Sequence, residues 1–122
     1  MNSSGLFALR NSSETEASRI LGAEGSLEDI GGRPVVVIKS SDGAVSAFCK
    51  AGKVYSVRVN APYDQDVKGV RIGDTQWAVE AVLGLPNRPW PINDGFVRWL
   101  YDGNPSVRVD FSTLGLVECI FI

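Results

Sequence analysis

The sequence contains no histidine, and this absence excludes several kinds of active site. Histidine is the usual general base at neutral pH, the central residue of catalytic triads and the most frequent transition-metal ligand. Nucleophiles activated by histidine are therefore impossible in this chain. No other set of residues has the ligand types and spacing of a metal or cofactor site, so we expect the protein to need neither.

Cysteine, excess charge and long apolar runs are also scarce. Cys49 and Cys119 are the only cysteines, and their apolar, strand-like surroundings indicate buried thiols, with a disulfide left open. The net charge of −2 gives no sign of the basic surface of a nucleic-acid-binding protein. The sequence has neither the roughly 18 consecutive apolar residues of a membrane span nor a secretory signal pattern. We expect a cytoplasmic protein that contacts neither nucleic acid nor membrane.

What the sequence does contain is an internal repeat. Residues 12–22 and 74–84 are both polar-capped segments with apolar residues at helical spacing, and both end in Leu-Gly. Three strand-like runs follow each segment, and Phe48 in the first copy matches Phe111 in the second. The sequence predicts one domain over residues 1–122, with a first repeat over about 6–59, a polar linker over 60–68 and a second repeat over about 69–122.

Each repeat is predicted to form one helix. Ser13 and Glu16 have the spacing of a capping box, so the first helix should begin at Ser13 and end at Gly22. The second helix should begin with Asp74 as its N-cap. Its apolar stripe is expected to lie in the core: Trp77, Ala78, Ala81, Val82 and Leu85.

Three strands should follow each helix, with turns at Asp-Gly and other glycine positions. The expected strands are 35–40, 44–50 and 53–59 in the first repeat, and 96–101, 106–111 and 116–122 in the second. Residues 86–95 are expected to form a proline-containing loop that carries Trp90. The fold class is therefore α+β, with two α-β-β-β repeats and helices packed on one face of an antiparallel sheet.

The strands of the second repeat are apolar on both sides. A strand with one face in water alternates apolar and polar residues, yet 96–101 and 117–122 are apolar at both parities. Either both faces of this part of the sheet are covered, or one is open. Two helices can cover one face only, so an open face would meet a partner.

Neighbouring strands of the second repeat carry the candidate partner-binding residues. Trp, Tyr and Arg are the residue types most enriched among the energetic anchors of protein interfaces. The alternative is that Trp99 and Tyr101 lie in the core while the charged residues pair across strands. Trp90 either fixes its loop to the core or lies at the rim of the interface. The candidates are Arg98, Trp99, Tyr101, Arg108, Asp110 and Trp90.

The second repeat resembles a known unit. Three segments carry the resemblance: Gly69-Val-Arg-Ile-Gly-Asp-Thr, Val79-Glu-Ala-Val-Leu-Gly-Leu-Pro86 and the strand Val107-Arg-Val-Asp-Phe111. They are similar to the repeat of the β-lactamase inhibitor protein and of the small SmpA/OmlA lipoproteins. The first repeat lacks the proline and the aromatic strand. The resemblance implies a continuous curved antiparallel sheet, with helices on the convex side and a concave side that grips another protein. No disulfide-spaced cysteine pairs, leader or lipobox cysteine appear, so secreted inhibition and outer-membrane assembly are not carried over.

Together these features predict a stoichiometric protein-binding inhibitor, by analogy a cytoplasmic immunity protein that occludes the active site of a cognate toxin. One alternative is a homodimeric structural or adaptor module. The other is an enzyme that uses a carboxylate pair, either Asp64 with Asp66 or Asp102 with Asp110. We expect no enzymatic activity, because carboxylates in linkers and hairpin turns usually stabilise the turn itself, and no phosphate-binding or nucleotide-binding motif is present.

Overall fold

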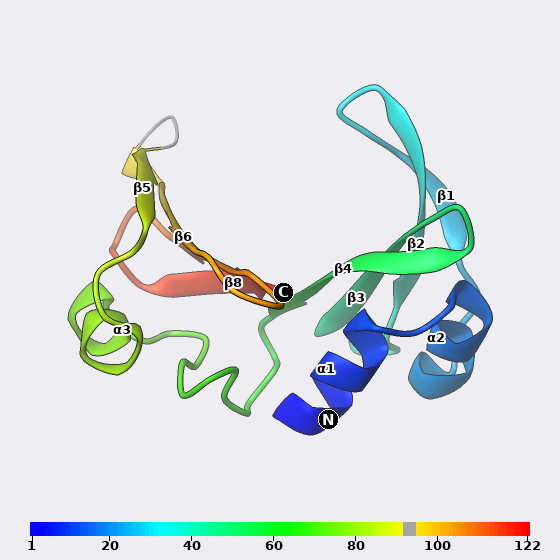
Figure 1. Cartoon of the computed structure of the whole chain (residues 1–122), viewed down its shortest axis with the longest axis horizontal. Helices are drawn as coiled ribbons and strands as arrows, with labels where there is room; N and C mark the ends of the chain where they lie inside the picture. The colour runs from blue at the N-terminus through cyan, green and yellow to red at the C-terminus, as the bar shows by residue number, and fades with distance from the viewer. Residues whose placement is uncertain (92–94) are drawn as a thin grey trace.

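A computed structural model describes residues 1–91 and 95–122 of the chain, and residues 92–94 of the predicted loop 86–95 lie outside the described residues. The fold is α+β, as predicted. The described residues form one antiparallel sheet of eight strands in the order β1-β2-β3-β4-β8-β7-β6-β5. Figure 1 shows that the sheet is arched and that the helices lie on its outer, convex side. The helices are α1 (Ser3–Arg10), α2 (Glu14–Leu21) and α3 (Gln76–Leu83).

The sheet consists of two meanders that meet at its centre. The first contains β1 (Ser26–Ile30), β2 (Arg33–Lys39), β3 (Val45–Lys50) and β4 (Lys53–Asn60). The second contains β5 (Arg88–Pro91), β6 (Val97–Tyr101), β7 (Val107–Phe111) and β8 (Val117–Phe121). Strands β4 and β8 join the halves, and the backbones of Val57 and Ile122 exchange hydrogen bonds of 2.8 and 2.9 Å. No helix of the described segments is both long and apolar enough to cross a membrane.

The first half has the expected helix and one that the prediction missed. Ser13 caps α2 as predicted, because its hydroxyl accepts a hydrogen bond from the Glu16 N–H at 3.1 Å. The preceding helix α1 begins at Ser3, and the side chain of its N-cap Asn2 accepts a hydrogen bond from the Gly5 N–H. Its residues Leu6 and Leu9, one turn apart, are fully buried. An N-cap residue followed by apolar residues at this spacing was the signal for α1 in the sequence.

The second helix begins one residue later than predicted, and its predicted buried stripe is wrong. Thr75 is the N-cap and accepts from the Ala78 N–H at 3.1 Å, while Asp74 accepts from the Arg71 N–H in the preceding turn. Trp77 is 79% exposed, and Ala81, Val82 and Leu85 are exposed as well. Helix α3 instead faces the core through fully buried Val79, and through Leu83 one turn later.

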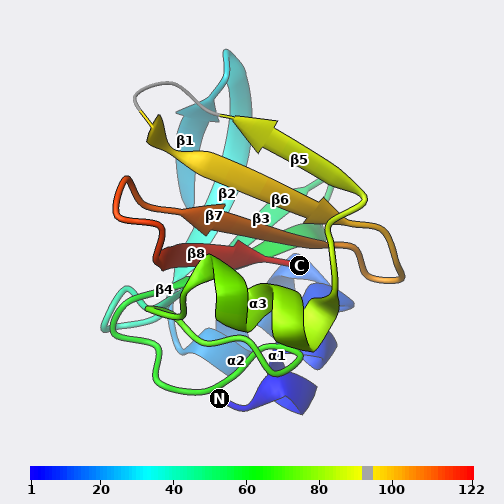
Figure 2. The same ribbon diagram turned by 90° about the vertical axis from the view of Figure 1, so that its left-hand side faces the viewer.

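Residues 60–68, which the sequence predicts as a polar linker, connect the two halves and also contribute side chains to the core. Tyr63 and Val67 are buried, and so is Val70 just beyond them. Val67 and Val70 exchange backbone hydrogen bonds of 2.8 and 3.0 Å. The Ser3 hydroxyl donates to the Asp66 carbonyl at 2.8 Å, which ties this segment to α1. The segment runs between α1 and α3 (Figure 2), and its buried residues belong to the same core cluster as Val79 of α3.

Among the described residues, each half has four strands rather than the three predicted. Strand β1 was missed because its side chains are mostly exposed, which removes the apolar alternation of a half-buried strand. Strand β5 contains Pro89 and Pro91, which mark a loop in sequence but are compatible with an edge strand. It is paired to β6 over its whole length, so part of the predicted loop 86–95 is a strand.

Candidate functional site

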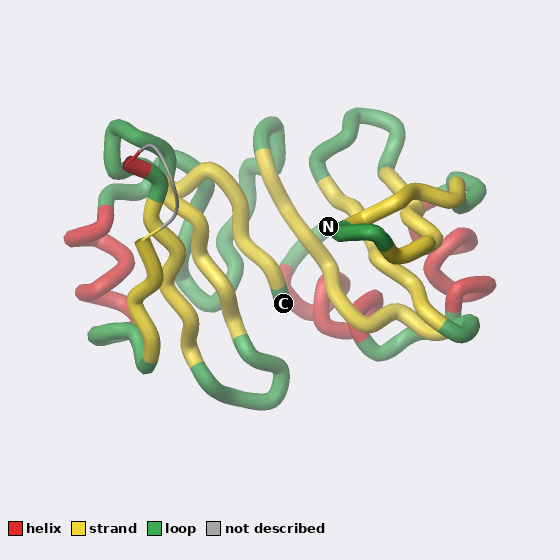
Figure 3. The backbone as a smooth tube through the Cα atoms, turned by 90° about the horizontal axis from the view of Figure 1, so that it is seen from above, coloured by secondary structure: helices red, strands yellow, loops and turns green. Residues whose placement is uncertain are grey.

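The inner side of the arch is a sheet face that no helix of the described residues covers. Figure 3 looks onto the arch from this side, with the two halves next to each other. Antiparallel sheets often leave one face in water, and that face is then polar. Here it instead carries a second, smaller hydrophobic cluster, separate from the main core and made of Val35, Val37 and Phe48 with Phe121 packed against them.

A cleft of about 460 Å³ lies on this face, at the junction of the two halves. Strands β1 to β4 form most of it, and β7 and β8 close it with Arg108 and Phe121. Phe48 and Phe121 are stacked with ring centroids 6.4 Å apart, and Tyr55 lies beside Phe48 at 6.5 Å. The lining residues are Glu28, Ile30, Val37, Lys39, Phe48, Tyr55, Ser56, Arg58, Arg108 and Phe121.

A β-bulge places Tyr55 in this cleft. Val54 pairs with Cys49 and Ser56 pairs with Phe48, which leaves Tyr55 as an extra residue on β4. A bulge changes the direction of a side chain without ending the strand. Tyr55 and Ser56 therefore both line the cleft, although successive residues of a regular strand point to opposite faces.

The cleft also contains cationic groups that stack on its aromatic rings. The Arg108 guanidinium carbon lies 3.7 Å from the centroid of Phe121, and that of Arg58 lies 5.4 Å from Phe48. Arg58 donates one long hydrogen bond of 3.4 Å to the Ser46 hydroxyl. Its Nε is buried and has no hydrogen-bond partner among the described residues. Stacking on aromatic faces holds a guanidinium in place and leaves its edges available.

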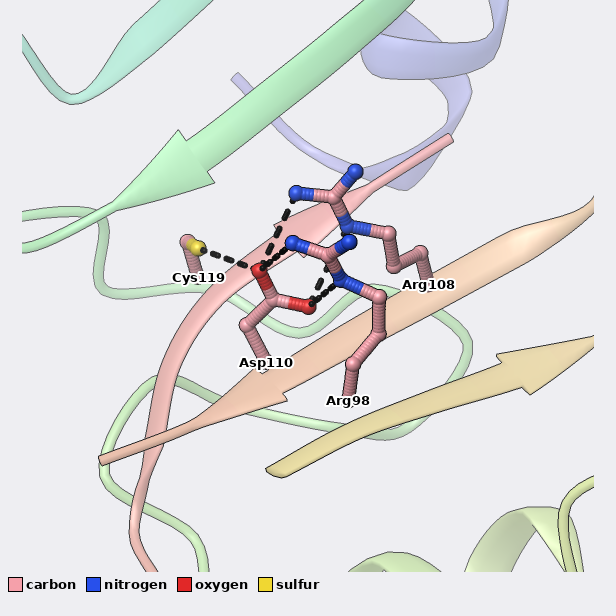
Figure 4. Close-up of polar contacts among 4 residues, drawn as sticks. All are labelled: Arg98, Arg108, Asp110 and Cys119. Carbon is pink, nitrogen blue, oxygen red and sulfur yellow. Dashed lines mark hydrogen bonds and ion pairs between the residues drawn. The ribbon is translucent and has the colours of Figure 1, made fainter. Parts of the chain in front are cut away.

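A cluster of two arginines and one aspartate adjoins the cleft (Figure 4). Arg98 donates to Asp110 through Nε at 3.0 Å and Nη2 at 3.3 Å. Arg108 donates to the same carboxylate at 3.2 and 3.1 Å. Both pairs are bidentate, the strong geometry for arginine and carboxylate. One carboxylate therefore neutralises only one of two guanidinium groups, and the cluster is positively charged.

The two cysteines are free thiols on different faces of the sheet. Cys119 lies on the inner face, with Sγ 3.8 Å from Asp110 Oδ2. Burial, with a further contribution from the Asp110 charge, raises the pKa of Cys119 to about 11. Burial also raises the pKa of Cys49. Both groups are protonated at neutral pH, which is the unreactive form of a cysteine.

Three of the four carboxylates considered as catalytic pairs, those of Asp66, Asp102 and Asp110, have structural partners. Asp102 is paired with Arg88 at 3.2 Å, and Asp110 is held between two arginines. Asp66 accepts from the Gly69 N–H at 2.9 Å in its turn. No group of three or more histidine, cysteine, aspartate or glutamate side chains within the described part of the chain could hold a metal ion.

The structure brings four of the six predicted partner-binding residues to one face. Arg98, Arg108 and Asp110 lie together on the inner face, and Trp90, which pairs with Arg98, is 58% exposed on the edge strand. Trp99 and Tyr101 lie on the helix side. The Trp99 ring packs edge-on against Phe111 at 4.8 Å, and buried Tyr101 donates to the Gly84 carbonyl at 2.9 Å.

Sequence reasoning missed Phe48, Tyr55, Arg58 and Phe121 as residues of the open face. Phe48 matches Phe111 in the sequence repeat, but the two rings lie on opposite sides of the sheet. In the observed register Phe48 pairs with Ser56 and Asp110 pairs with Cys119. Phe48 therefore occupies the position of Asp110, and a shift of one residue exchanges the faces.

Comparison with known proteins gives one point of reference for this fold. The crystal structure of a DUF4309 family protein, YjgB, from Bacillus subtilis subsp. subtilis str. 168 aligns with a TM-score of 0.57 and 15% sequence identity. The alignment covers 90% of this chain and 76% of that chain. At this identity the likeness shows the fold alone. No protein-family model matches the sequence, and no curated protein matches it significantly.

Proposed function

We propose that the chain is a stoichiometric protein-binding inhibitor whose partner docks on the inner face of the arch. The observation that carries this proposal is the aromatic-lined cleft with its stacked arginines, on a sheet face that the described helices leave open. Buried aromatic and arginine side chains supply most of the energy at protein interfaces. An apolar cluster with a charged rim matches the usual anatomy of such a surface.

The backbone of this surface favours binding by a rigid partner. Each strand that lines the cleft is hydrogen-bonded to a neighbour on both sides, apart from edge strand β1. A preorganised surface loses little conformational entropy on association, so more of the contact energy appears as affinity. The arch is concave, and a protruding loop of the partner would fill it.

Within this class we propose an immunity protein that neutralises a cognate bacterial toxin by covering its active site. Inhibition by occlusion needs no catalytic group on the inhibitor. The Asp110 carboxylate and the Cys119 thiol, which would be the reactive groups of the inner face, are both engaged with neighbouring side chains. Their contacts support a role in shaping the surface.

We also infer that the two halves derive from one duplicated α-β-β-β unit to which each half adds a further strand. The final strand of each half has a bulge, at Tyr55 in β4 and at Glu118 in β8. The meanders are arranged in opposite order around the β4 and β8 pair. Duplication followed by edge pairing of β4 with β8 would join two such units into one continuous twisted sheet.

The test uses the product of the gene directly upstream, because immunity genes generally follow their toxin genes. Expression of that product alone should arrest growth of a bacterial host, and co-expression of this chain should restore it through a one-to-one complex. Tyr55→Ala should weaken the complex about 10-fold or more, as loss of an interface aromatic does. Trp77→Ala, on the opposite side of the molecule, is the matched control and should bind normally.

Two outcomes would contradict the proposal. Growth arrest that this chain does not relieve would reject the inhibitor function. A complex that tolerates Tyr55→Ala but is lost in Trp77→Ala would place the interface on the convex side. The alternative of a homodimeric module predicts twice the chain mass of 13.1 kDa in sedimentation equilibrium, and a monomer at micromolar concentration would reject it.

A further inference from the structure

We infer that Arg58 and Arg108 form a carboxylate-binding site in the cleft, which takes an acidic side chain of the partner protein. This inference rests on the proposed docking at the inner face and names the chemistry of the occupant. The chain as a whole carries −2, but the centre of the inner face has an excess of positive charge, because Arg98 and Arg108 share the single carboxylate of Asp110 and Arg58 in the same cleft adds a third cation.

The other charged residues of the cleft do not remove this excess. Lys39 and Glu28, on the far wall, are 3.5 Å apart and neutralise each other. In the described structure, no carboxylate forms an ion pair with Arg58. The only hydrogen-bond partner of its side chain in that part is the neutral Ser46 hydroxyl, at 3.4 Å. A partly buried guanidinium without an anion is costly, and an incoming carboxylate would relieve that cost.

Arg58 and Arg108 are positioned to act together. Arg58 pairs with Phe121 across β4 and β8, and Phe121 pairs with Arg108 across β8 and β7. The two arginines therefore flank one aromatic residue in the same row of the sheet, and with adjacent strands about 4.8 Å apart their long side chains can reach a common ligand. Arg108 uses Nε and Nη2 for Asp110, which leaves Nη1 directed elsewhere.

The cleft walls decide which anion fits. Val37, Phe48 and Phe121 form an apolar surface around the cationic groups. A free inorganic anion would leave this surface wet, whereas an acidic side chain flanked by apolar residues would cover it. Nucleic acid is disfavoured, because the positive charge is confined to one cleft of an acidic chain and forms no stripe for a phosphate backbone. The occupant that matches both charge and walls is a glutamate or aspartate beside an aromatic or aliphatic residue.

The test is an NMR titration of the full-length chain, labelled with ¹⁵N, with two peptides that differ by one charge. The probes are acetyl-Phe-Glu-Phe-amide and acetyl-Phe-Gln-Phe-amide. The glutamate peptide should bind about 10-fold more tightly, since a charged hydrogen bond is stronger than a neutral one. It should shift the Arg58 and Arg108 side-chain Nε resonances, and its affinity should fall as salt increases.

Variants identify the arginine that carries the effect. Arg58→Gln should reduce the affinity for the glutamate peptide to that for the glutamine peptide, and Arg58→Lys should retain part of it. Arg88→Gln is the matched control, because Arg88 is exposed on edge strand β5 and pairs with Asp102 outside the cleft. Unchanged thermal midpoints would show that each variant is folded.

Equal binding of the two peptides, or full binding by Arg58→Gln, would overturn the inference. So would displacement of the glutamate peptide by an equal concentration of inorganic phosphate. Failure of the carboxylate site can be distinguished from failure of the proposed inhibitor function. A toxin complex that is sensitive to Tyr55→Ala but not to Arg58→Gln would retain the docking face and reject the carboxylate site. Specific binding of the glutamate peptide without toxin neutralisation would retain the site and reject the inhibitor role.

Discussion

The two halves of the molecule cover the convex side of the sheet in different ways. In the first half two helices do so, and Leu6 and Leu9 of α1 with Ala17 of α2 are fully buried. In the second half α3 buries only Val79 completely. The remaining space is filled by the segment between the halves, through residues such as Val67 and Val70. A well-anchored loop here performs the packing that a second helix performs in the first half.

This difference leaves apolar side chains of α3 in water. Trp77 and Val82 are 79% and 53% exposed, although the sequence predicts them in a buried stripe, and Leu85, just beyond the end of α3, is 76% exposed. Sequence periodicity identifies the apolar side of a helix but does not identify what covers it. The comparison predicts that the same kind of substitution will have unequal effects in the two halves.

The largest effect is expected when the halves are separated. Residues 1–61 and 62–122, expressed as two fragments, should each be unfolded or aggregated, because each exposes an unpaired central strand and loses part of a shared core. Circular dichroism and thermal melting of the fragments would measure this. Two soluble fragments that melt cooperatively would show that the halves are independent domains.

Leu6→Ala in the first half should reduce the free energy of unfolding by about 3 kcal/mol, because it leaves a cavity at a fully buried position. Leu85→Ala in the second half is the matched control and should change it by less than about 0.5 kcal/mol, as is usual for exposed sites. Urea denaturation of both variants would test the difference. Equal losses would mean that Leu85, just after α3, is as well packed as Leu6 of α1.

Two tryptophans on paired strands test the two faces within the second half. Trp99→Ala should cost about 2 kcal/mol of stability, because this half-buried ring packs on Phe111. Trp90→Ala, on the open face, should change stability by less than about 0.5 kcal/mol. Trp99 substitutions that are neutral for folding but abolish partner binding would return Trp99 to the interface.

The thiols predict a decline of stability at high pH. Because burial raises the pKa of Cys119 to about 11 in the folded chain, its contribution is fully present below the unfolded pKa near 9 and is lost as pH rises toward 11. The Cys119→Ala variant should show a flatter dependence of the denaturation midpoint on pH above 9. Cys49→Ala, in the first half, should flatten it less. An unchanged slope in Cys119→Ala would show that this thiol ionises normally.

The smallest effect is expected at Trp77. Trp77→Ala should change the free energy of unfolding by no more than about 0.5 kcal/mol, whereas a core tryptophan would cost about 3 to 5 kcal/mol. Chemical denaturation gives the answer directly. A large loss of unfolding free energy would indicate that Trp77 is buried, as the sequence predicts.

The sequence predicts the parts of this fold that depend on local chemistry. The Ser13 cap, the hairpin turns and six of the strands follow from short patterns, and the structure confirms them within a residue or two. Helix α1 was missed despite a usable signal, while β1 and β5 lack the alternation that identifies strands. The packing of residues 60–70 depends on α1 and on the second half together, so no local pattern indicates it.

The candidate site also combines features that local sequence patterns predict with features that depend on pairing across the sheet. Arg98, Arg108 and Asp110 share a face because of simple alternation on adjacent strands, which the sequence displays. Tyr55 reaches that face only through a bulge. Phe48 reaches it because the strand register differs by one residue from the match between the two sequence repeats. Register and bulges are set by pairing across the sheet.

The position of β8 has a consequence for synthesis of the protein. This strand follows all seven others along the chain but occupies the middle of the sheet, between β4 and β7. The first meander can form on the ribosome as soon as residue 60 has emerged, yet the hydrogen-bonding edge of β4 stays open until the β8 residues arrive. During that interval the nascent chain presents an unpaired strand edge, the feature most prone to pair with a neighbouring chain. A chain whose synthesis ends before residue 117 would therefore be prone to aggregate.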